Sequence, residues 1–253
     1  MSSVRKYEPR GDVAADKRPI LFVPGWGMDD NASKEFAQRV ANASGQSVFT
    51  FEYDPQFRVG RGPNAIINAK ALMVLRAAHE VQTMTGVDVL DVIGYSEGCL
   101  VALYAKEMSK GVFGRFSLIA PAGVNPSMGY LGIAFDAVRN ALQNFLVSFS
   151  LGQEDKQRIK THKRSCGQWM KTRGRIRALF EGMAPGRIDA IDLYRKLAGC
   201  RIAFFLHDIM VPAEPETAQI LEVAGAQVRV LSDAGHFGFY TKQEKLVRTL
   251  FPK

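Results

Sequence analysis

Short apolar runs alternate with amphipathic segments along most of this chain. The runs are rich in β-branched and aromatic residues and end in glycine, proline or polar residues, which is typical of buried parallel strands. We expect such strands at 19–23, 47–51, 87–93, 116–120, 201–206 and 227–231. Helical periodicity and helix start and stop residues predict helices at 33–43, 63–84, 98–109, 215–224 and 241–251. This alternation indicates an α/β protein with a mostly parallel, doubly wound sheet.

One interval, residues 124–197, breaks this rhythm. Its first half carries a stripe of large apolar residues at steps of three and four, which predicts an amphipathic helix: Phe135, Val138, Leu142, Phe145 and Phe149. We therefore expect an α/β core made of residues 1–123 and 198–253. Residues 124–197 would form a helical cap insertion that sits on the sheet.

Residues 94–98 (GYSEG) have the pattern G-x-S-x-G between a predicted strand and a predicted helix. That context is typical of a nucleophile elbow, a sharp turn that holds a serine hydroxyl above a sheet at the start of a helix. Small residues two before and two after the serine let the backbone pack closely. Ser96 is therefore the candidate nucleophile. The alternative is a chance Gly-Ser turn.

A serine needs a base to remove its proton, and the chain has four histidines. His79 lies inside a predicted helix and His162 lies in the predicted cap, so we expect both on the surface. His207 ends a predicted strand. His236 follows the last predicted strand, in a loop at the edge of the sheet where ligand chemistry gathers in parallel folds. We favour His236 as the general base; otherwise it is a plain loop histidine.

The base in turn needs an acid that fixes its tautomer and stabilises the imidazolium. Asp208 follows the predicted strand 201–206 and gives the chain order Ser, Asp, His, which is typical of such sites. The alternative role for Asp208 is a turn or helix cap. Asp233 is a weak substitute, because it is three residues from His236 and cannot easily reach round to its Nδ1.

An oxyanion hole needs two main-chain N–H groups aimed where negative charge develops. We expect one from Glu97, the residue after the serine. The second should come from the loop 24–27 (PGWG), with Trp26 as the donor and its indole as a wall of the acyl pocket. Alternatively, Trp26 only packs.

Together these motifs resemble the α/β-hydrolase superfamily: PGWG at 24–27, GYSEG at 94–98, DIMVP at 208–212 and GHF at 235–237. The resemblance covers most of the chain except the cap, and it is poorly specific for substrate. It implies a mostly parallel sheet, a Ser-Asp-His triad, no cofactor or metal, and acyl chemistry on esters, thioesters, amides or carbon–carbon bonds.

The chain departs from the superfamily pattern in several places. About 18 residues precede the first clear strand, so we expect the two leading strands to be missing or reduced. Pro24-Gly25 stands where His-Gly is usual. Glu97 puts a carboxylate near the site, which either disfavours anionic acyl groups or points at solvent. Ser96 argues against haloalkane dehalogenases, which carry aspartate there.

Composition is ordinary for a globular protein, with 47% hydrophobic and 23% charged residues among 253. Three cysteines without a CxxC pair argue against a disulfide framework and a structural zinc site. We find neither the apolar segment of a signal peptide nor a run long enough to span a bilayer. We expect a soluble, cytoplasmic protein.

Charge is concentrated in one window. Residues 156–177 hold nine basic residues and no acidic one, whereas the rest of the chain holds 24 basic and 25 acidic residues. A cationic cap with a Gly-Trp-Gly loop resembles the carrier-protein methyl ester esterases of biotin synthesis, in which the cap binds an acidic carrier protein. Thioesters of coenzyme A or of a carrier protein would suit the same charge. The alternative is a solvated helix face.

The function we expect is therefore a serine hydrolase that cleaves carboxylic esters through an acyl-enzyme on Ser96. A thioesterase or carrier-protein-linked methyl ester esterase that uses the basic cap is the first alternative, and a non-catalytic ligand-binding protein is the second. Nucleic-acid binding is disfavoured because no such motif occurs and the charge is confined to one segment. An enzyme that works at a membrane surface stays an alternative, because the apolar stripe at 135–149 is able to contact lipid.

Overall fold

The computed structural model describes most of the α/β core and parts of the predicted cap. The described residues are 4–11, 17–28, 30–54, 60, 62–124, 153, 156–157, 160, 164, 167, 170–172, 174–208, 211–212, 214–232, 234–236 and 238–252. The apolar stripe at 135–149, His162 and Asp233 lie outside these residues.

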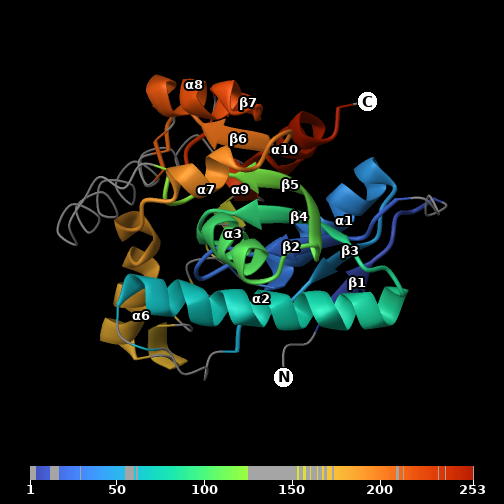
Figure 1. Ribbon diagram of the computed structural model, residues 1–253, viewed down its shortest axis with the longest axis horizontal. Helices are drawn as coiled ribbons and strands as arrows, with labels where there is room; N and C mark the ends of the chain where they lie inside the picture. Colours follow the sequence, from blue (N-terminus) through green and yellow to red (C-terminus); the bar gives the residue numbers. More distant parts are fainter. Residues whose placement is uncertain are drawn as a thin grey trace.

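Seven strands form one sheet in the order β1-β3-β2-β4-β5-β6-β7 (Figure 1). The strands are β1 (Arg5–Tyr7), β2 (Ile20–Val23), β3 (Val48–Thr50), β4 (Leu90–Tyr95), β5 (Phe113–Ile119), β6 (Arg201–Phe205) and β7 (Gln227–Leu231). All neighbours are parallel except β1, which pairs antiparallel with β3. The predicted fold class, a mostly parallel sheet, is confirmed.

Strand β1 is the element that the hydrophobic pattern does not predict. Its sequence, Arg-Lys-Tyr, is mostly exposed, and it lies at the edge of the sheet against β3. Main-chain pairing with β3 holds it there, together with the partly buried Tyr7 and the ion pairs of Arg5, so no hydrophobic alternation in its sequence marks it. Within the described residues, β1 is the strand that precedes β2.

Helices cover both faces of the sheet. They are α1 (Asp30–Ser44), α2 (Pro63–Thr85), α3 (Glu97–Met108), α6 (Arg175–Met183), the 3₁₀ turn η1 (Pro185–Arg187), α7 (Ile191–Arg195), α8 (Pro215–Val223), α9 (Gly238–Thr241) and α10 (Gln243–Leu250). Helices α2 and α3 pack together on one face, and α1 and α10 pack together on the other (Figure 1). Pro63 starts α2, and Gly86 in the left-handed conformation ends it, as the sequence predicts.

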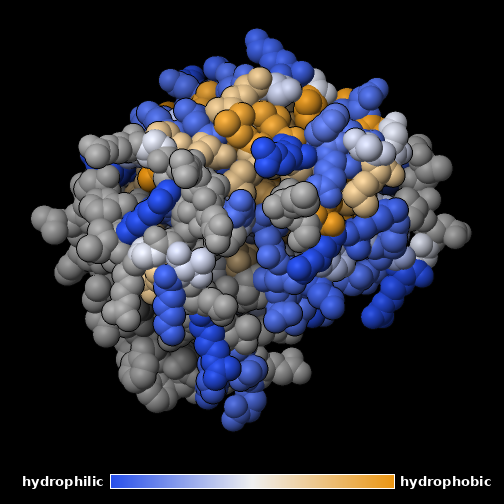
Figure 2. All heavy atoms as spheres, turned by 90° about the horizontal axis from the view of Figure 1, so that it is seen from below, coloured by the Kyte–Doolittle hydropathy of each residue, from blue (hydrophilic) through white to orange (hydrophobic). Residues whose placement is uncertain are grey.

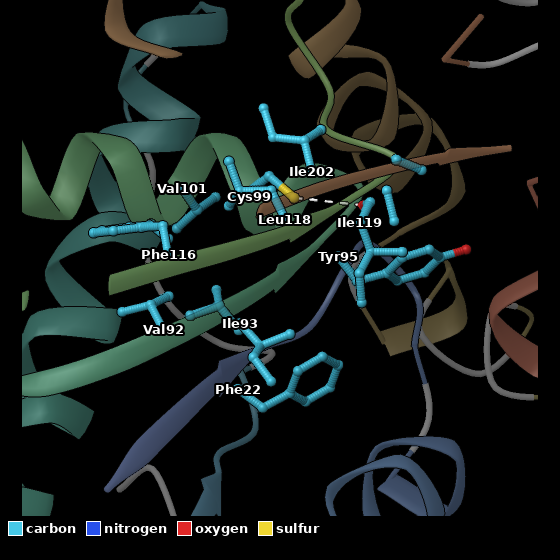
Figure 3. Packing of buried hydrophobic residues seen from close by; sticks show 14 of the residues in the cluster. Phe22, Val92, Ile93, Tyr95, Cys99, Val101, Phe116, Leu118, Ile119 and Ile202 are labelled. Atoms are coloured by element: carbon cyan, nitrogen blue, oxygen red, sulfur yellow. Dashed lines mark hydrogen bonds between the residues drawn. The ribbon is translucent and has the colours of Figure 1, made fainter. Parts of the chain in front are cut away.

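The central strands are buried on both faces. Every residue of β2 and β4 is buried. Burial on both faces explains the unbroken apolar run of β2, whereas the run of β4 is interrupted by Asp91, which is paired with Arg115. Figure 3 shows side chains of this core, among them Phe22, Ile93 and Ile119. On the α1 side, Phe22 packs against Phe36, with the ring centroids 5.3 Å apart. The core therefore fixes the carboxyl end of β4, where the serine follows.

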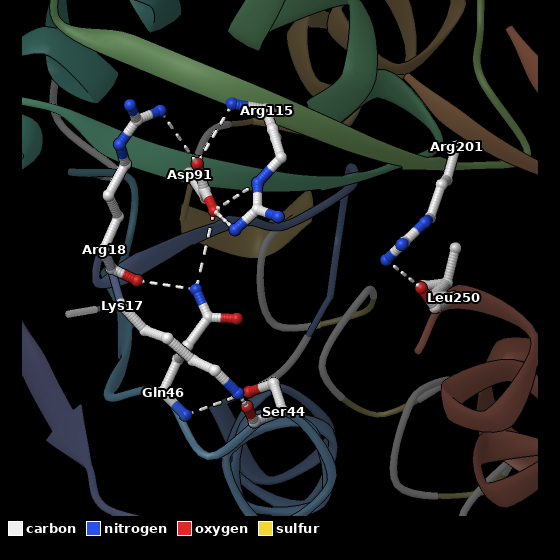
Figure 4. Close-up of polar contacts among 8 residues, drawn as sticks. All are labelled: Lys17, Arg18, Ser44, Gln46, Asp91, Arg115, Arg201 and Leu250. Atoms are coloured by element: carbon white, nitrogen blue, oxygen red, sulfur yellow. Dashed lines mark hydrogen bonds and ion pairs between the residues drawn. The ribbon is translucent and has the colours of Figure 1, made fainter. Parts of the chain in front are cut away.

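An ion-pair cluster lies near the amino-terminal ends of the central strands, away from Ser96 (Figure 4). Asp91 of β4 accepts hydrogen bonds from the main-chain N–H and the guanidinium of Arg115, and it lies 3.8 Å from Arg18. Gln46 donates to the main-chain oxygen of Arg18. Strand β5 begins at Phe113, three residues earlier than its apolar run predicts, because Phe113 pairs with Leu90. The register shifts between Leu90 and Val92, where Asp91 accepts the main-chain N–H of Arg115.

Two more cations near these strand ends bind the carboxyl ends of helices. Lys17 donates to the carbonyl oxygen of Ser44, the last residue of α1, and Arg201 donates to the carbonyl oxygen of Leu250, the last residue of α10 (Figure 4). Cations favour the carbonyl ends of helices, where the last oxygens lack helical partners. These side chains therefore act within the fold.

In the view from below, hydrophilic side chains cover much of the described surface, around one gathering of hydrophobic ones (Figure 2). No helix in the described part of the chain has both the length and the apolar character needed to cross a bilayer.

Candidate active site

The turn from β4 to α3 holds Ser96 in a conformation that few side chains adopt. Its φ of 52° and ψ of −121° place a non-glycine residue in a strained region. The main chain secures it: the N–H of Ser96 donates to Ile119 at 2.8 Å, and its carbonyl oxygen accepts from Cys99 and Ala122. Such strain indicates a functional position, because the surrounding structure has to over-determine it.

The two motif glycines allow this turn to pack. A Cβ at Gly98 would lie 2.2 Å from the carbonyl oxygen of Val23, and a Cβ at Gly94 would lie 2.8 Å from the Cα of Cys99. Both neighbours are backbone atoms that cannot give way. The start of α3 is therefore pressed against the end of β2, and the loop after β2 is brought to the serine.

The structure brings Ser96, His236 and Asp208 together from three segments of the chain. Ser96 Oγ lies 3.2 Å from His236 Nε2, and His236 Nδ1 lies 2.8 Å from Asp208 Oδ2. The other carboxylate oxygen, Oδ1, accepts the main-chain N–H of Val211 at 2.9 Å. Asp208 and His236 are buried, whereas Ser96 is partly exposed. His79 and His207 are exposed.

Tyr95 also belongs to the site, although the sequence analysis does not single it out. Its hydroxyl donates to the carbonyl oxygen of His236 at 2.9 Å, and its ring stacks on the imidazole with centroids 5.5 Å apart. It also stacks on Phe239 of α9. Tyr95 thus anchors the histidine loop to β4. Its only sequence signal is its place before the serine.

The loop after β2 passes directly beside the nucleophile. A Cβ at Gly25 would lie 3.2 Å from the Cβ of Ser96 and 3.0 Å from the carbonyl oxygen of Tyr95. On the other side, Glu97 is the first residue of α3, so its N–H has no acceptor within the helix. Both chain segments expected to supply oxyanion donors therefore border the serine.

The indole of Trp26 packs against α6. A Cβ at Gly182 would lie 2.9 Å from Cε2 of the indole. The indole Nε1 is buried without a hydrogen-bond partner in the described part of the chain. Trp26 therefore makes a packing contact with the predicted cap, and its expected contact with substrate stays a prediction.

The side chain of Glu97 forms a buried ion pair. Lys70 Nζ of α2 donates to both carboxylate oxygens, at 2.7 and 2.6 Å, and the two side chains are 1% and 2% exposed. The alternative that this carboxylate points at solvent is therefore wrong. The sequence hides the pair because Lys70 stands among the apolar residues of a long helix, 27 positions before its partner.

Other ionisable groups surround this pair. Tyr53 lies beside it, with its ring centroid 5.3 Å from Lys70 Nζ. Glu181 of α6 is also buried and accepts from Arg177 Nε at 3.1 Å. Burial raises the pKa of the Glu97 carboxyl, and the charge of Glu181 raises it further, while the attraction and hydrogen bonds of Lys70 oppose both.

Much of the basic window is described, and its described residues between 156 and 172 are helical. Four cations there are exposed: Lys156, Lys160, Arg164 and Lys171. Arg177 differs, because it pairs with the buried Glu181. At least four positive charges of the window therefore face solvent.

Among the described residues, no group of three His, Cys, Asp or Glu side chains is arranged to hold a metal ion. Cys99 and Cys200 are free, buried thiols. Burial raises the pKa of both, that of Cys200 to about 11, so both are poor nucleophiles near neutral pH. In Figure 3, the Cys99 thiol donates to the carbonyl oxygen of Ile119. Of the thiols and hydroxyls described at this turn, the Ser96 hydroxyl is the one that contacts a ring nitrogen of His236.

Comparison with known proteins gives structural neighbours only. No family model matches the chain, and no curated protein sequence matches it. A lipase-esterase related protein from Clostridium acetobutylicum superposes with a TM-score of 0.68 and 12% identity, over 98% of this chain and 97% of the other. An esterase from Exiguobacterium antarcticum gives 0.67 and 15%, over 98% and 93%. An N-acyl homoserine lactone degrading enzyme gives 0.64 and 13%, over 98% and 95%.

These likenesses cover almost the whole of each chain. At such low identity they establish the fold and not the reaction, because one fold hosts many activities. The chain has the α/β-hydrolase fold, which agrees with its strand order and with the expectation from its motifs.

Proposed function

We propose that this protein is a serine hydrolase that cleaves carboxylic esters through an acyl-enzyme on Ser96. The observation that carries the proposal is the continuous chain of contacts from Ser96 Oγ through both ring nitrogens of His236 to Asp208. A hydroxyl becomes a useful nucleophile when a base is within hydrogen-bond reach and a third group orients that base.

In the proposed mechanism, Nε2 of His236 takes the proton of Ser96 as Oγ attacks the ester carbonyl carbon. Asp208 holds the Nδ1 proton, so that Nε2 is free to act as the base, and it stabilises the imidazolium that forms. The carbonyl oxygen becomes an oxyanion, which accepts hydrogen bonds from the main-chain N–H groups of Glu97 and Trp26.

Collapse of the tetrahedral intermediate breaks the bond to the alcohol, which leaves with the proton from His236. A water molecule then gives a proton to the same nitrogen and attacks the acyl carbon. The second intermediate releases the carboxylic acid and restores Ser96. This cycle uses a single base for both halves and needs no redox partner.

A second candidate is hydrolysis of a thioester or a carrier-protein-linked methyl ester. The exposed cations Lys156, Lys160, Arg164 and Lys171 favour it, because a cationic rim attracts an anionic substrate or an acidic carrier protein. The chemistry at Ser96 would be the same. The two candidates therefore differ in the leaving group and in the role of the window.

The experiment that tests the proposal is labelling with a fluorophosphonate, followed by peptide mapping and assay. We expect the label on Ser96 and hydrolysis of p-nitrophenyl esters, both abolished in Ser96→Ala; esters of rising acyl length then size the pocket. Absence of labelling and turnover in folded wild-type protein would instead favour a non-catalytic ligand-binding protein.

A further inference from the structure

The ion pair between Lys70 and Glu97 is unusual for its position. Both side chains are almost completely buried, and Glu97 directly follows Ser96, the proposed nucleophile, in the chain. Removing two charges from water is costly, and well-packed apolar residues of similar size often stabilise a fold equally well. Stability alone therefore gives a weak reason for a buried pair at this position.

The chemistry of the site supplies a stronger reason. Glu97 is a proposed oxyanion donor through its main-chain N–H, yet its own side chain carries a negative charge. An uncompensated carboxylate here would repel the oxyanion that the N–H has to stabilise, and low-dielectric surroundings would strengthen that repulsion. Lys70 binds both carboxylate oxygens, so it fixes the direction of the side chain as well as cancelling its charge.

We propose that Lys70 is a positioning residue for the oxyanion hole: it holds the Glu97 carboxylate against α2 and neutralises it, so that the Glu97 N–H meets the developing oxyanion without an opposing charge. This inference rests on the proposed serine-hydrolase function. Lys70 itself touches neither substrate nor nucleophile. It acts through Glu97.

The other ionisable groups around Glu97 do not replace Lys70. Tyr53 and Cys99 have pKa values raised by burial, so both are neutral near pH 7. Glu181 adds a second negative charge from α6, and its ion-pair partner is Arg177. Across the elbow, His236 is bound to Asp208. In the described part of the chain, Lys70 is the cation in direct contact with Glu97.

The test compares Lys70→Met with the wild type across pH 5.5–9, with active sites counted by fluorophosphonate so that only competent protein enters kcat. We expect kcat at pH 8.5 to fall roughly 10- to 100-fold while KM stays within about threefold. The loss should shrink in acid. Burial and the charge of Glu181 raise the pKa of Glu97, and without Lys70 the interactions that lower it are lost, so the carboxyl is neutral at low pH and opposes the oxyanion only at high pH.

Two further variants separate charge from structure. Lys70→Met/Glu97→Gln removes both charges, and we expect it to regain most of the kcat lost in Lys70→Met. Lys70→Gln keeps an N–H donor for Glu97 and removes only the charge; it should reproduce the high-pH loss, and it carries the test if Lys70→Met does not fold. Arg76→Met is the matched control, because it removes a cation from the exposed face of the same helix. It should retain wild-type kcat.

If Lys70→Gln and Lys70→Met keep wild-type kcat at every pH, or if the double variant stays as slow as Lys70→Met, Lys70 is only structural and the inference is wrong. A wild type no more active than Ser96→Ala refutes the proposed function and this inference with it. An active wild type with unaffected Lys70 variants refutes the inference alone.

Discussion

At the scale of single residues, the site depends on groups that function only in contact. Ser96 and His236 stand 140 positions apart in the chain and meet at 3.2 Å. In the proposed mechanism neither side chain does acyl chemistry alone, because the hydroxyl needs a base to remove its proton. The energetics of their variants should therefore be strongly non-additive.

We predict that Ser96→Ala and His236→Ala each lower kcat by about 10⁴- to 10⁶-fold, and that the double variant is slower than the worse single variant by no more than about threefold. Steady-state assays on purified, folded proteins measure this. Losses that multiply in the double variant would mean that the two residues act independently.

In the proposed mechanism Asp208 orients the base, so it should matter through the tautomer of His236. Asp208→Asn keeps the shape of the side chain but favours the tautomer with its proton on Nε2, and we predict a fall in kcat of about 10⁴-fold with little loss of stability. Activity together with thermal unfolding checks both parts. A near-normal rate in this variant would assign the acid to another carboxylate.

At the scale of elements, the elbow depends on how closely α3 approaches the end of β2. Ser96 keeps its strained φ because hydrogen bonds to Ile119, Cys99 and Ala122 surround it, and two glycines leave room for the backbone. Tyr95 joins the same turn to the histidine loop. Contacts between β2, β4, α3 and the histidine loop, rather than local sequence preference, therefore fix the positions of Ser96 and His236.

We predict that Gly98→Ala destabilises the protein by about 2–4 kcal/mol and removes nearly all activity. The added methyl would meet the carbonyl oxygen of Val23 at 2.2 Å, so the loop after β2 would have to move away from the serine. Urea unfolding and ester hydrolysis measure the two effects. Gly11→Ala is the control, because an added Cβ there has no atom within 4 Å; an equal loss in both variants would contradict the packing explanation.

At the scale of the whole molecule, charge is divided between a nearly neutral remainder and one cationic window. Exposed cations of the window face solvent, while Arg177 is bound to Glu181. Surface charges act over a distance that salt shortens, from roughly 20 Å at 0.02 M to roughly 4 Å at 0.5 M. An effect of the window on substrate capture should therefore depend on ionic strength.

We predict that a thioester of coenzyme A or of an acidic carrier protein has a higher kcat/KM than a neutral ester of the same acyl group, and that salt reduces this advantage. Changing Lys156, Lys160 and Arg164 to Glu should reduce it too, without altering turnover of the neutral ester; Arg177 is left intact because it pairs inside the fold. Identical responses of both substrates would make the window a solvated face.

The sequence by itself determines the parts of this protein that local chemistry specifies. Apolar runs form buried strands, so the structure contains the six predicted strands and the helices between them. The elbow motif marks Ser96, because a tight strand-to-helix turn requires its glycines. The expected partners also come together, His236 against Ser96 and Asp208 against His236, because loops at the carboxyl ends of parallel strands converge there.

Tertiary structure alone decides contacts between segments that carry no mark of each other. Strand β1 forms through main-chain pairing at a sheet edge, so its polar side chains give no signal. Tyr95 reaches the carbonyl oxygen of His236, and Lys70 is buried against Glu97, because packing brings α2, α3 and the last loop to the same place. A lysine in an amphipathic helix is usually solvated; only the fold, by closing α2 over the elbow, makes this one the partner of a buried carboxylate.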